Sequence, residues 1–228
     1  MRCPRSSGGD HTAQPAMAQQ DIVQSGQSLR TGNVIGLPVT VGTPDTVRDA
    51  IIARAKSDSG AYVCVANVHM LVTARRHADF RSVVDNADFV TTDGMPLVWV
   101  IRRQGYLHAE RVYGADLTLG LCRVAERDGL GVYFYGGERE TLANLKQALL
   151  SRFPKLKIVG MESPPLLPEK AEVDPSVVKR IKDSGATLVF VGLGCPKQEY
   201  WMSTYSPQFN AALLGVGAAF DMLAGTKR

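Results

Sequence analysis

Short apolar runs alternate with longer amphipathic segments along most of the chain. The runs have the length of buried strands, and they lie at residues 61–67, 88–94, 130–137, within 155–168, at 186–194 and at the start of 210–225. Segments with the apolar spacing of helices lie between them, at 43–58, 68–87, 95–105, 110–129, 138–154 and 174–185. Parallel strands need such crossovers, which cover both faces of a sheet. The pattern predicts an α/β fold, a parallel sheet with helices on both faces and room for two small subdomains.

The amino-terminal region differs from the rest of the chain. Residues 1–32 are polar and poor in branched apolar side chains, and they lack the apolar centre of a signal peptide, so a flexible leader is predicted. The globular core is then predicted to span residues 33–228. It opens with a hairpin or edge strand at 33–42, followed by a helix at 43–58 with Thr43 as its N-cap.

Composition limits the classes of function. A net charge of +4 and a pI near 8.9 suit anionic ligands or an anionic membrane surface. Without a dense Lys/Arg stripe, this charge does not predict nucleic-acid binding. The four cysteines and four histidines lack metal-ligand spacing, so no metal site is predicted, and a reducing cytoplasm is expected. No apolar stretch approaches the roughly 20 residues that span a bilayer.

Unusual residues follow the predicted strands. In open α/β sheets, ligands gather at the carboxyl ends of the strands. The residues at these positions are Asn67, Asp93, Gly94, Gly136, Gly137, Gly192, Gly194, Gly215 and Gly217. Glycine lets the backbone approach a ligand, and helix N-termini offer free N–H groups, so a diphosphate fits such turns. The alternative is that the glycines form tight turns only.

Two nucleotide-binding signatures are missing. The chain has no Gly-x-x-x-x-Gly-Lys-Ser/Thr sequence, which argues against an NTP hydrolase. It has no Gly-x-Gly-x-x-Gly after its first strand, which argues against an NAD-dependent oxidoreductase. The sequence GVGAAFD at 215–221 matches the second signature only in part.

Asp93 is the main candidate for acid/base chemistry. It lies between an apolar strand and the apolar segment 95–101, and such surroundings raise the pKa of a carboxyl group and make it a better base. The alternative is a carboxylate that caps the next helix. Arg111 is either a phosphate clamp or, with Glu110, half of a surface ion pair.

Two more segments have competing interpretations. Lys197 and Gln198, together with Glu199, either contact a ligand or form the solvated first turn of a helix. The sequence MPLVWVIRR at 95–103 is predicted to form a buried helix, and a lipid-facing surface is the alternative.

Six motifs occur in the order of a known family. They are AN at 66–67, DG at 93–94, ERVYGADL at 110–117, YGG at 135–137, VGLGCPKQEYW at 191–201 and GVGAAFDMLAG at 215–225. Together they resemble the WecG/TagA/CpsF family of glycosyltransferases, glycosyltransferase family 26, from about residue 33 onward. The resemblance implies a Rossmann-like enzyme, peripheral on the cytoplasmic face of the inner membrane. Such an enzyme moves a sugar from a UDP-sugar donor to a sugar on undecaprenyl diphosphate, with inversion and without a metal or other cofactor.

The resemblance also implies roles for residues. Asp93 matches the proposed base that takes the proton from the acceptor hydroxyl, and Arg111 matches an arginine implicated in activity. The substrate-binding residues would be Asn67, Val65, Gly94, Gly136, Gly137, Gly192, Gly194, Lys197, Gln198 and Gly217. Displacement at an anomeric carbon needs an oriented acceptor, a base and stabilisation of the departing UDP. Since the chain has no Asp-x-Asp motif, helix N-termini and cations must stabilise the UDP.

Two departures from the family pattern affect these expectations. Well-known members carry Thr where this chain has Val65, so a hydroxyl contact to the donor is lost. The sequence VANVHM at 65–70 is closer to exopolysaccharide members, such as the xanthan-assembly β-1,4-glucosyltransferase, and favours UDP-glucose over UDP-N-acetylmannosamine.

The second departure concerns the carboxyl terminus. The family continues with a basic, aromatic appendage associated with membrane docking, whereas this chain ends at Arg228. We therefore expect a truncated form that is soluble and weakly active or inactive, and that self-associates into homo-oligomers. The alternative from another functional class is a noncatalytic nucleotide-binding or scaffold module of the same fold.

Overall fold

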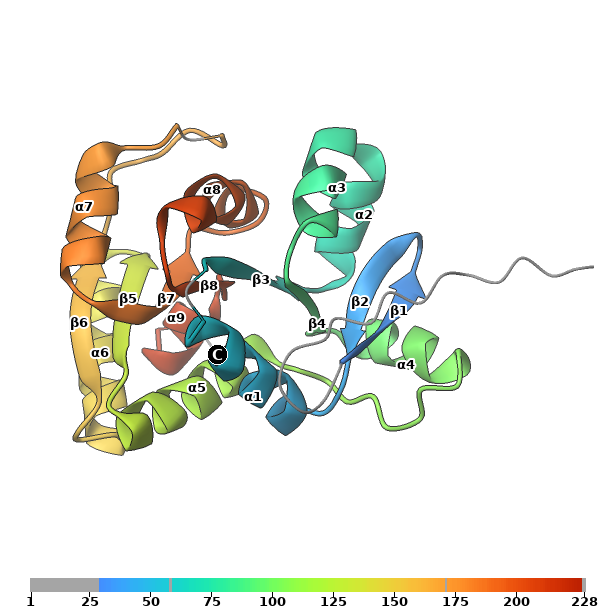
Figure 1. Cartoon of the computed structure of the whole chain (residues 1–228), viewed down its shortest axis with the longest axis horizontal. Coiled ribbons are helices and arrows are strands. Elements are labelled where there is room, and N and C mark those ends of the chain that lie inside the picture. The colour runs from blue at the N-terminus through green and yellow to red at the C-terminus, as the bar shows by residue number, and fades with distance from the viewer. Residues whose placement is uncertain (1–28, 58, 171, 227–228) are drawn as a thin grey trace, which may run out of the picture.

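The computed structural model describes residues 29–57, 59–170 and 172–226 (Figure 1). Six parallel strands form one sheet in the order β4-β3-β8-β7-β5-β6, and β1 and β2 form a separate antiparallel pair. The strands are β1 (Arg30–Val34), β2 (Leu37–Val41), β3 (Ala61–Ala66), β4 (Phe89–Thr92), β5 (Gly131–Gly136), β6 (Lys157–Glu162), β7 (Ala186–Gly192) and β8 (Ala212–Gly215). The α/β class predicted from the alternating pattern is confirmed.

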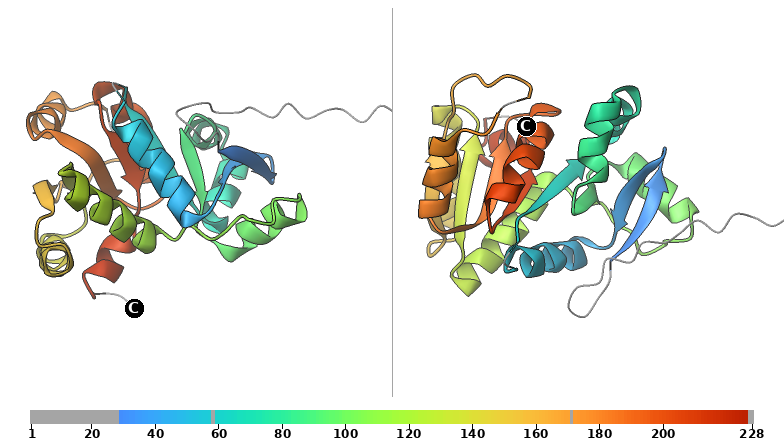
Figure 2. Two further views of the ribbon diagram at one scale, coloured as in Figure 1. Left: turned by 60° about the horizontal axis from the view of Figure 1, so that its bottom comes forward. Right: turned by 45° about the horizontal axis from the view of Figure 1, so that its top comes forward.

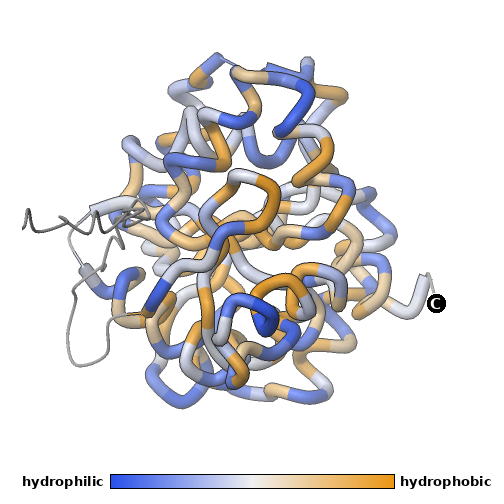
Figure 3. Tube along the Cα trace, turned by 90° about the vertical axis from the view of Figure 1, so that its right-hand side faces the viewer, coloured by the Kyte–Doolittle hydropathy of each residue, from blue (hydrophilic) through white to orange (hydrophobic). Residues whose placement is uncertain are grey.

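Helices cover both faces of the sheet (Figure 2). They are α1 (Pro44–Ala55), α2 (Val68–Arg76), α3 (Ala78–Asp85), α4 (Met95–Arg103), α5 (Gly114–Asp128), α6 (Arg139–Arg152), α7 (Pro175–Asp183), α8 (Lys197–Tyr205), the 3-10 helix η1 (Ser206–Gln208) and α9 (Ala219–Leu223). Alternate residues of β7 enter different core clusters: Val189 belongs to the cluster that includes residues of α2, α3, α4, α7 and α8, and Phe190 to the cluster that includes residues of α1, α5, α6 and α9. Apolar positions accordingly concentrate toward the interior of the trace (Figure 3).

The β1–β2 hairpin lies beside β4, outside the six-stranded sheet. Its two-residue turn, Ile35 and Gly36, has φ angles of 49° and 91°, as primed turns require. The Val90 N–H donates to Thr40 Oγ1 at 3.1 Å, which attaches β2 to β4. The predicted hairpin is confirmed, but β1 begins at Arg30, so the boundary predicted after residue 32 falls inside a strand. Residues 1–28 of the predicted leader lie outside the described residues.

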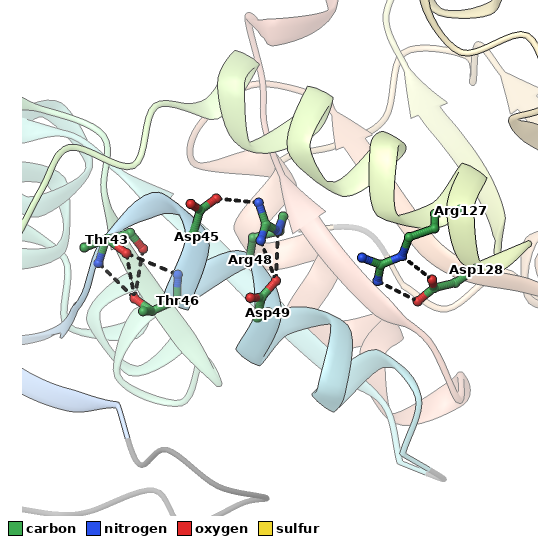
Figure 4. Close-up of polar contacts among 7 residues, drawn as sticks. All are labelled: Thr43, Asp45, Thr46, Arg48, Asp49, Arg127 and Asp128. Carbon is green, nitrogen blue, oxygen red and sulfur yellow. Dashed lines mark hydrogen bonds and ion pairs between the residues drawn. The ribbon is translucent and has the colours of Figure 1, made fainter.

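Local caps explain where the first helices begin. At the start of α1, the Thr46 N–H donates to Thr43 Oγ1 at 3.3 Å, and the Thr43 N–H donates to Thr46 Oγ1 at 2.9 Å (Figure 4). One turn later, Arg48 pairs with Asp45 and with Asp49 on the same helix (Figure 4). The predicted N-cap is confirmed. The segment 68–87, predicted as one or two helices, forms two, because His77 between them is extended at φ −124° and ψ 107°.

The predicted burial of the segment 95–103 is only half right. Helix α4 buries Leu97, Val98 and Ile101, but Met95, Trp99 and Val100 are exposed. The helix lies at the periphery, below the β1–β2 hairpin (Figure 1), and no other described element covers its outer face.

Candidate active site

Strands β3 and β4 end side by side. Ala66 pairs with Thr92, and the Asp93 N–H donates to the Ala66 carbonyl at 2.9 Å. The residues that follow each strand are therefore neighbours: a Cβ on Gly94 would lie 3.9 Å from the Asn67 Cα. Asn67 is exposed and is the N-cap of α2, where its Oδ1 accepts from the Met70 N–H at 3.1 Å.

The Asp93 carboxylate lies at this edge, half-hidden beneath Arg111. Its side chain is 20% exposed, and its Oδ1 lies 3.4 Å from Arg111 Nη2. Arg111 Nε also donates to the main-chain oxygen of Asp93, and its guanidinium lies 4.4 Å from the centre of the Tyr113 ring. Burial raises the pKa of Asp93, while the charge of Arg111 and the Gly114 N–H act in the opposite direction. The carboxyl is thus accessible, oriented and easier to protonate than an exposed aspartate.

The structure excludes two of the alternative interpretations, the helix cap for Asp93 and the Glu110 ion pair for Arg111. Helix α4 has Gly94 as its N-cap and no side-chain cap, so Asp93 does not cap it. Arg111 pairs with Asp93 rather than with Glu110. The backbone beside β4 holds this geometry, because the Val112 N–H donates to the Thr92 carbonyl at 2.8 Å and Thr92 Oγ1 donates to the Glu110 carbonyl at 2.7 Å.

The start of α5 connects Asp93 to the end of β8. A Cβ on Gly114 would lie 3.4 Å from Val65 Cγ1 and 3.7 Å from the Val216 carbonyl oxygen. Val65 itself is buried in β3 beneath this junction. The sequence analysis did not single out Gly114, although it lies in the motif ERVYGADL. Its role depends on contacts with two strands distant in sequence.

The glycine turns of β5, β7 and β8 lie next to one another. Gly136 pairs with Gly192, and the Gly137 N–H donates to the Gly192 carbonyl at 3.0 Å. The N–H groups of Val216 and Gly217 both donate to the Val191 carbonyl, at 3.0 and 3.3 Å. Gly194, at φ 79°, has no atom within 4 Å of a Cβ position and is exposed.

The Gly137 turn is less suited to a diphosphate than the other two. It borders a hollow of about 410 Å³ that is lined by Gly137, Glu138, Glu140, Thr141, Asp221 and Thr226. Three of these side chains are carboxylates, which repel a phosphate. The turns at β7 and β8 are therefore the better anion site.

The first turn of α8 is not solvated. Gln198 is 4% exposed and Glu199 is 0% exposed, so the solvated-turn alternative is wrong for both. Gln198 Nε2 donates to Glu199 Oε1 at 2.7 Å, and Gln198 Oε1 has no hydrogen-bond partner among the described residues. That oxygen lies 3.4 Å from the Cβ position of Gly217. Lys197 Nζ donates to the Leu167 carbonyl at 2.7 Å, which directs this cation toward the segment before α7.

A series of neighbouring residues links the two halves of the site. It runs from Asp93 through Gly114 to Val216, and then through Gly217 to Gln198. Asn67 and Gly94 lie at the β3–β4 end of this series, and Gly192 lies at the opposite end. Lys197 instead bonds to the Leu167 carbonyl, and Gly136 packs against the backbone of Gly192. At the β3–β4 end, this edge of the sheet has the accessible Asp93 carboxylate and the Arg111 cation. At the β7–β8 end it has glycine turns and the unpartnered amide oxygen of Gln198.

The sequence analysis named Glu199 but did not predict that its carboxyl group would be fully buried. Burial raises the pKa of Glu199 to about 7, whereas the bond from Gln198 acts against this rise. The nearest sequence signal is the aromatic pair that follows it, Tyr200 and Trp201, because both lie in the core.

The raised pKa of Glu199 makes stability depend on pH. The folded protein holds this proton up to about pH 7, whereas an unfolded chain releases it near the ordinary glutamate pKa of 4.5. The contribution of this proton to the free energy of unfolding is fully present below pH 4.5 and is lost as the pH rises through 7. The total loss is on the order of 3 kcal/mol. We expect Glu199→Gln to remove this loss, as measured by urea unfolding between pH 5 and pH 8. The exposed control Glu140→Gln should keep the wild-type slope; equal slopes in all three proteins would contradict the prediction.

The described residues contain neither a metal-ligand cluster nor a membrane-spanning helix. No cluster of three His, Cys, Asp or Glu side chains there could hold a metal ion. Within the same residues, no helix has the length and apolar content to cross a bilayer.

Comparisons with known proteins identify the family. The sequence profile of the Glycosyl transferase WecG/TagA/CpsF family matches residues 32–228. A curated relative from Bacillus spizizenii, named N-acetylglucosaminyldiphosphoundecaprenol N-acetyl-beta-D-mannosaminyltransferase, is 28% identical over 169 residues. The aligned part is 74% of this chain and 64% of the relative, so the chain spans less than two thirds of that protein's length. Since the profile covers nearly the whole described fold, the resemblance seen in the six motifs is confirmed, and the chain belongs to the WecG/TagA/CpsF family of glycosyltransferases.

Proposed function

We propose that this protein is an inverting, metal-independent glycosyltransferase. It moves a sugar from a UDP-sugar to a sugar carried on undecaprenyl diphosphate, in the synthesis of an exopolysaccharide or another cell-surface polysaccharide. The observation that carries the proposal is the partly exposed Asp93 carboxylate, paired with Arg111 and joined by a series of neighbouring residues to the glycine turns.

Asp93 is the proposed base. Its carboxylate takes the proton from the acceptor hydroxyl as the acceptor oxygen attacks the anomeric carbon of the donor. The new bond from this oxygen to the carbon forms while the bond from the carbon to the UDP oxygen breaks, and UDP leaves with that electron pair. Attack from the face opposite the leaving group inverts the anomeric centre.

The departing diphosphate needs positive charge and N–H donors. The N-terminus of α8 and the exposed turn at Gly194 provide main-chain N–H groups at the anion end of the site, whereas the Gly217 N–H already bonds to the Val191 carbonyl. Arg111, whose side chain is 45% exposed, provides a cation from the Asp93 side. Gln198, buried behind Gly217, supports the turn from inside rather than contacting the donor directly.

The sequence VANVHM at 65–70 and the relative's name indicate different donors. Val65 presents methyl groups where a threonine would present a hydroxyl, and it is buried beside Gly114, so a hydroxyl contact to the donor is lost. On the basis of VANVHM we propose UDP-glucose as the preferred donor. The name of the relative makes UDP-N-acetylmannosamine the second candidate and makes a lipid-linked N-acetylglucosamine the first acceptor to test.

The proposed location of the enzyme follows from the acceptor. A substrate with a polyprenyl tail stays in the membrane, so the enzyme is proposed to act peripherally at the cytoplasmic face of the inner membrane. Self-association into homo-oligomers is also proposed. The rival function is a nucleotide-binding scaffold module that retains the fold without turnover.

A donor panel tests the proposed function. The protein is incubated with UDP-glucose, UDP-N-acetylmannosamine or UDP-N-acetylglucosamine and a short-chain polyprenyl diphosphate that carries N-acetylglucosamine. We expect release of UDP together with one new disaccharide-lipid, detected by mass spectrometry, with UDP-glucose the fastest donor. UDP binding without any product from the panel would favour the scaffold module.

A further inference from the structure

The outer face of α4 is an apolar surface without a partner in the described structure. Met95 and Trp99, four residues apart, point to the same side of the helix, and Val100 flanks them. These side chains are 38%, 59% and 38% exposed, respectively. The inner residues of the same helix are fully buried, so α4 is held firmly while its large apolar side chains face outward. We call Met95, Trp99 and Val100, together with Leu107, the α4 face.

The α4 face begins at the proposed catalytic aspartate. Met95 is separated from Asp93 only by Gly94, the N-cap of the helix. At the other end, the chain turns through Gly105, and Leu107 adds a side chain that is 77% exposed. An apolar track therefore extends from the proposed base outward along the whole length of α4.

The charge within α4 and the turn after it, residues 95–109, is of one sign. The segment 95–109 contains Arg102 and Arg103 and no Asp or Glu. Arg102 Nε donates to the Ala109 carbonyl at 2.8 Å, which fixes one guanidinium at the carboxyl end of the helix. Arg103 is exposed and makes no hydrogen bond or ion pair among the described residues. These arginines favour a partner that supplies negative charge.

A second copy of the chain matches this preference poorly. A symmetric dimer through the α4 face would add the arginines of both copies and no carboxylate from the segment 95–109 of either. An anionic bilayer supplies opposite charge to arginine, an interfacial depth where tryptophan is favoured, and apolar chains for methionine, valine and leucine. The nine residues of α4 are too few to span a bilayer, so the helix would lie in the plane of the interface.

We propose that the α4 face lies on the anionic surface of a lipid bilayer and holds Asp93 beside that surface. The link from binding to turnover rests on the proposed function, because a lipid-linked acceptor presents its sugar just above the bilayer. Binding itself needs neither donor nor acceptor. The two ideas can therefore be tested separately.

Intrinsic fluorescence reports this contact directly. The chain has two tryptophans, Trp99 on the face and Trp201, which is 1% exposed in the core. We expect vesicles of phosphatidylglycerol and phosphatidylcholine to shift the emission to shorter wavelength, and brominated lipids to quench it. Trp99→Phe, which keeps the apolar face, should still sediment with vesicles but should lose both optical changes.

Sedimentation with vesicles measures the strength of binding. Met95→Gln with Trp99→Gln should weaken binding to the anionic vesicles by about tenfold or more, since two interfacial side chains are lost. The matched control is Leu166→Gln, which removes a side chain that is 95% exposed on the segment between β6 and α7, and it should bind like wild type. Arg103→Gln should weaken binding at low salt and have less effect at high salt.

Three results would overturn the proposal. They are equal binding by the double variant and Leu166→Gln, no preference for anionic over neutral vesicles, and a dimer in solution that the double variant dissociates. Turnover separates this proposal from the proposed function. The double variant should keep its rate on a soluble short-chain acceptor and lose rate on a vesicle-borne acceptor. Vesicle binding through Trp99 without turnover by wild type would retain the α4 face and refute the proposed function.

Discussion

Replacing Asp93 with asparagine is expected to lower the rate of sugar transfer by a factor of about 10³, because the amide cannot accept the proton of the acceptor hydroxyl. Affinity for UDP should change by less than about threefold, since the nucleotide is proposed to bind at the Gly194 turn and the N-terminus of α8. Single-turnover transfer and calorimetric titration with UDP measure the two quantities. Asparagine has nearly the shape of aspartate, so the Arg111 contact at the main-chain oxygen of residue 93 is retained.

The control for this variant is Asp116→Asn. Asp116 is exposed in the first turn of α5 and acts on Asp93 only through its charge, which contributes to the raised pKa of Asp93. Removing that charge should leave transfer within a few-fold of wild type. If Asp93→Asn kept wild-type turnover, Asp93 would not be the base, and if neither protein had turnover, the scaffold module would be favoured.

Gly136→Ala is expected to have the largest effect on stability, a loss of about 3 kcal/mol or more in the free energy of unfolding. Gly136 has a φ of 115°, which L side chains rarely adopt. A Cβ there would lie 2.4 Å from the Gly192 carbonyl oxygen, which is backbone and cannot rotate away. The variant would separate the ends of β5 and β7 and disturb the turn that follows Gly192. Urea unfolding gives the free energy, and UDP titration of the folded fraction gives the effect on the site.

Gly105→Ala is the matched control. Gly105 has a comparable φ of 96°, but a Cβ there meets no atom within 4 Å. It should lose only the cost of the backbone conformation, about 1 kcal/mol. The difference between the two variants measures the clash between the strands. Equal losses would mean that the ends of β5 and β7 can separate at no cost.

Local features of this fold were predictable, and the reason is that they depend on neighbours in sequence. The Thr43 cap needs only Thr46, three residues away, and the hairpin turn at Gly36 needs only its own backbone angle. The position of Asp93 was also predictable, because the carboxyl ends of parallel strands always meet at one edge of a sheet. Its neighbour Asn67 follows from the same rule.

The environment of each site residue was less predictable. Gln198 and Glu199 precede an aromatic run on a polar first turn, and nothing in that pattern shows that β8 packs against them. Arg111 follows Glu110 in sequence, yet it pairs with Asp93, because the Val112 N–H bonds to β4 and turns the segment back.

The sequence by itself determined the α/β class, the caps and turns, the family and the place of Asp93 at a strand end, since period, spacing and motif order are local properties of the chain. Tertiary structure alone decided three other features. Strand β8 lies between β3 and β7 and so completes the site, Glu199 is sealed in the core, and α4 presents Trp99 to the outside. Strand order and burial depend on which distant segments pack together, and hydropathy does not record that choice. The hydropathy pattern of an apolar helix is the same whether both of its faces are covered or only one.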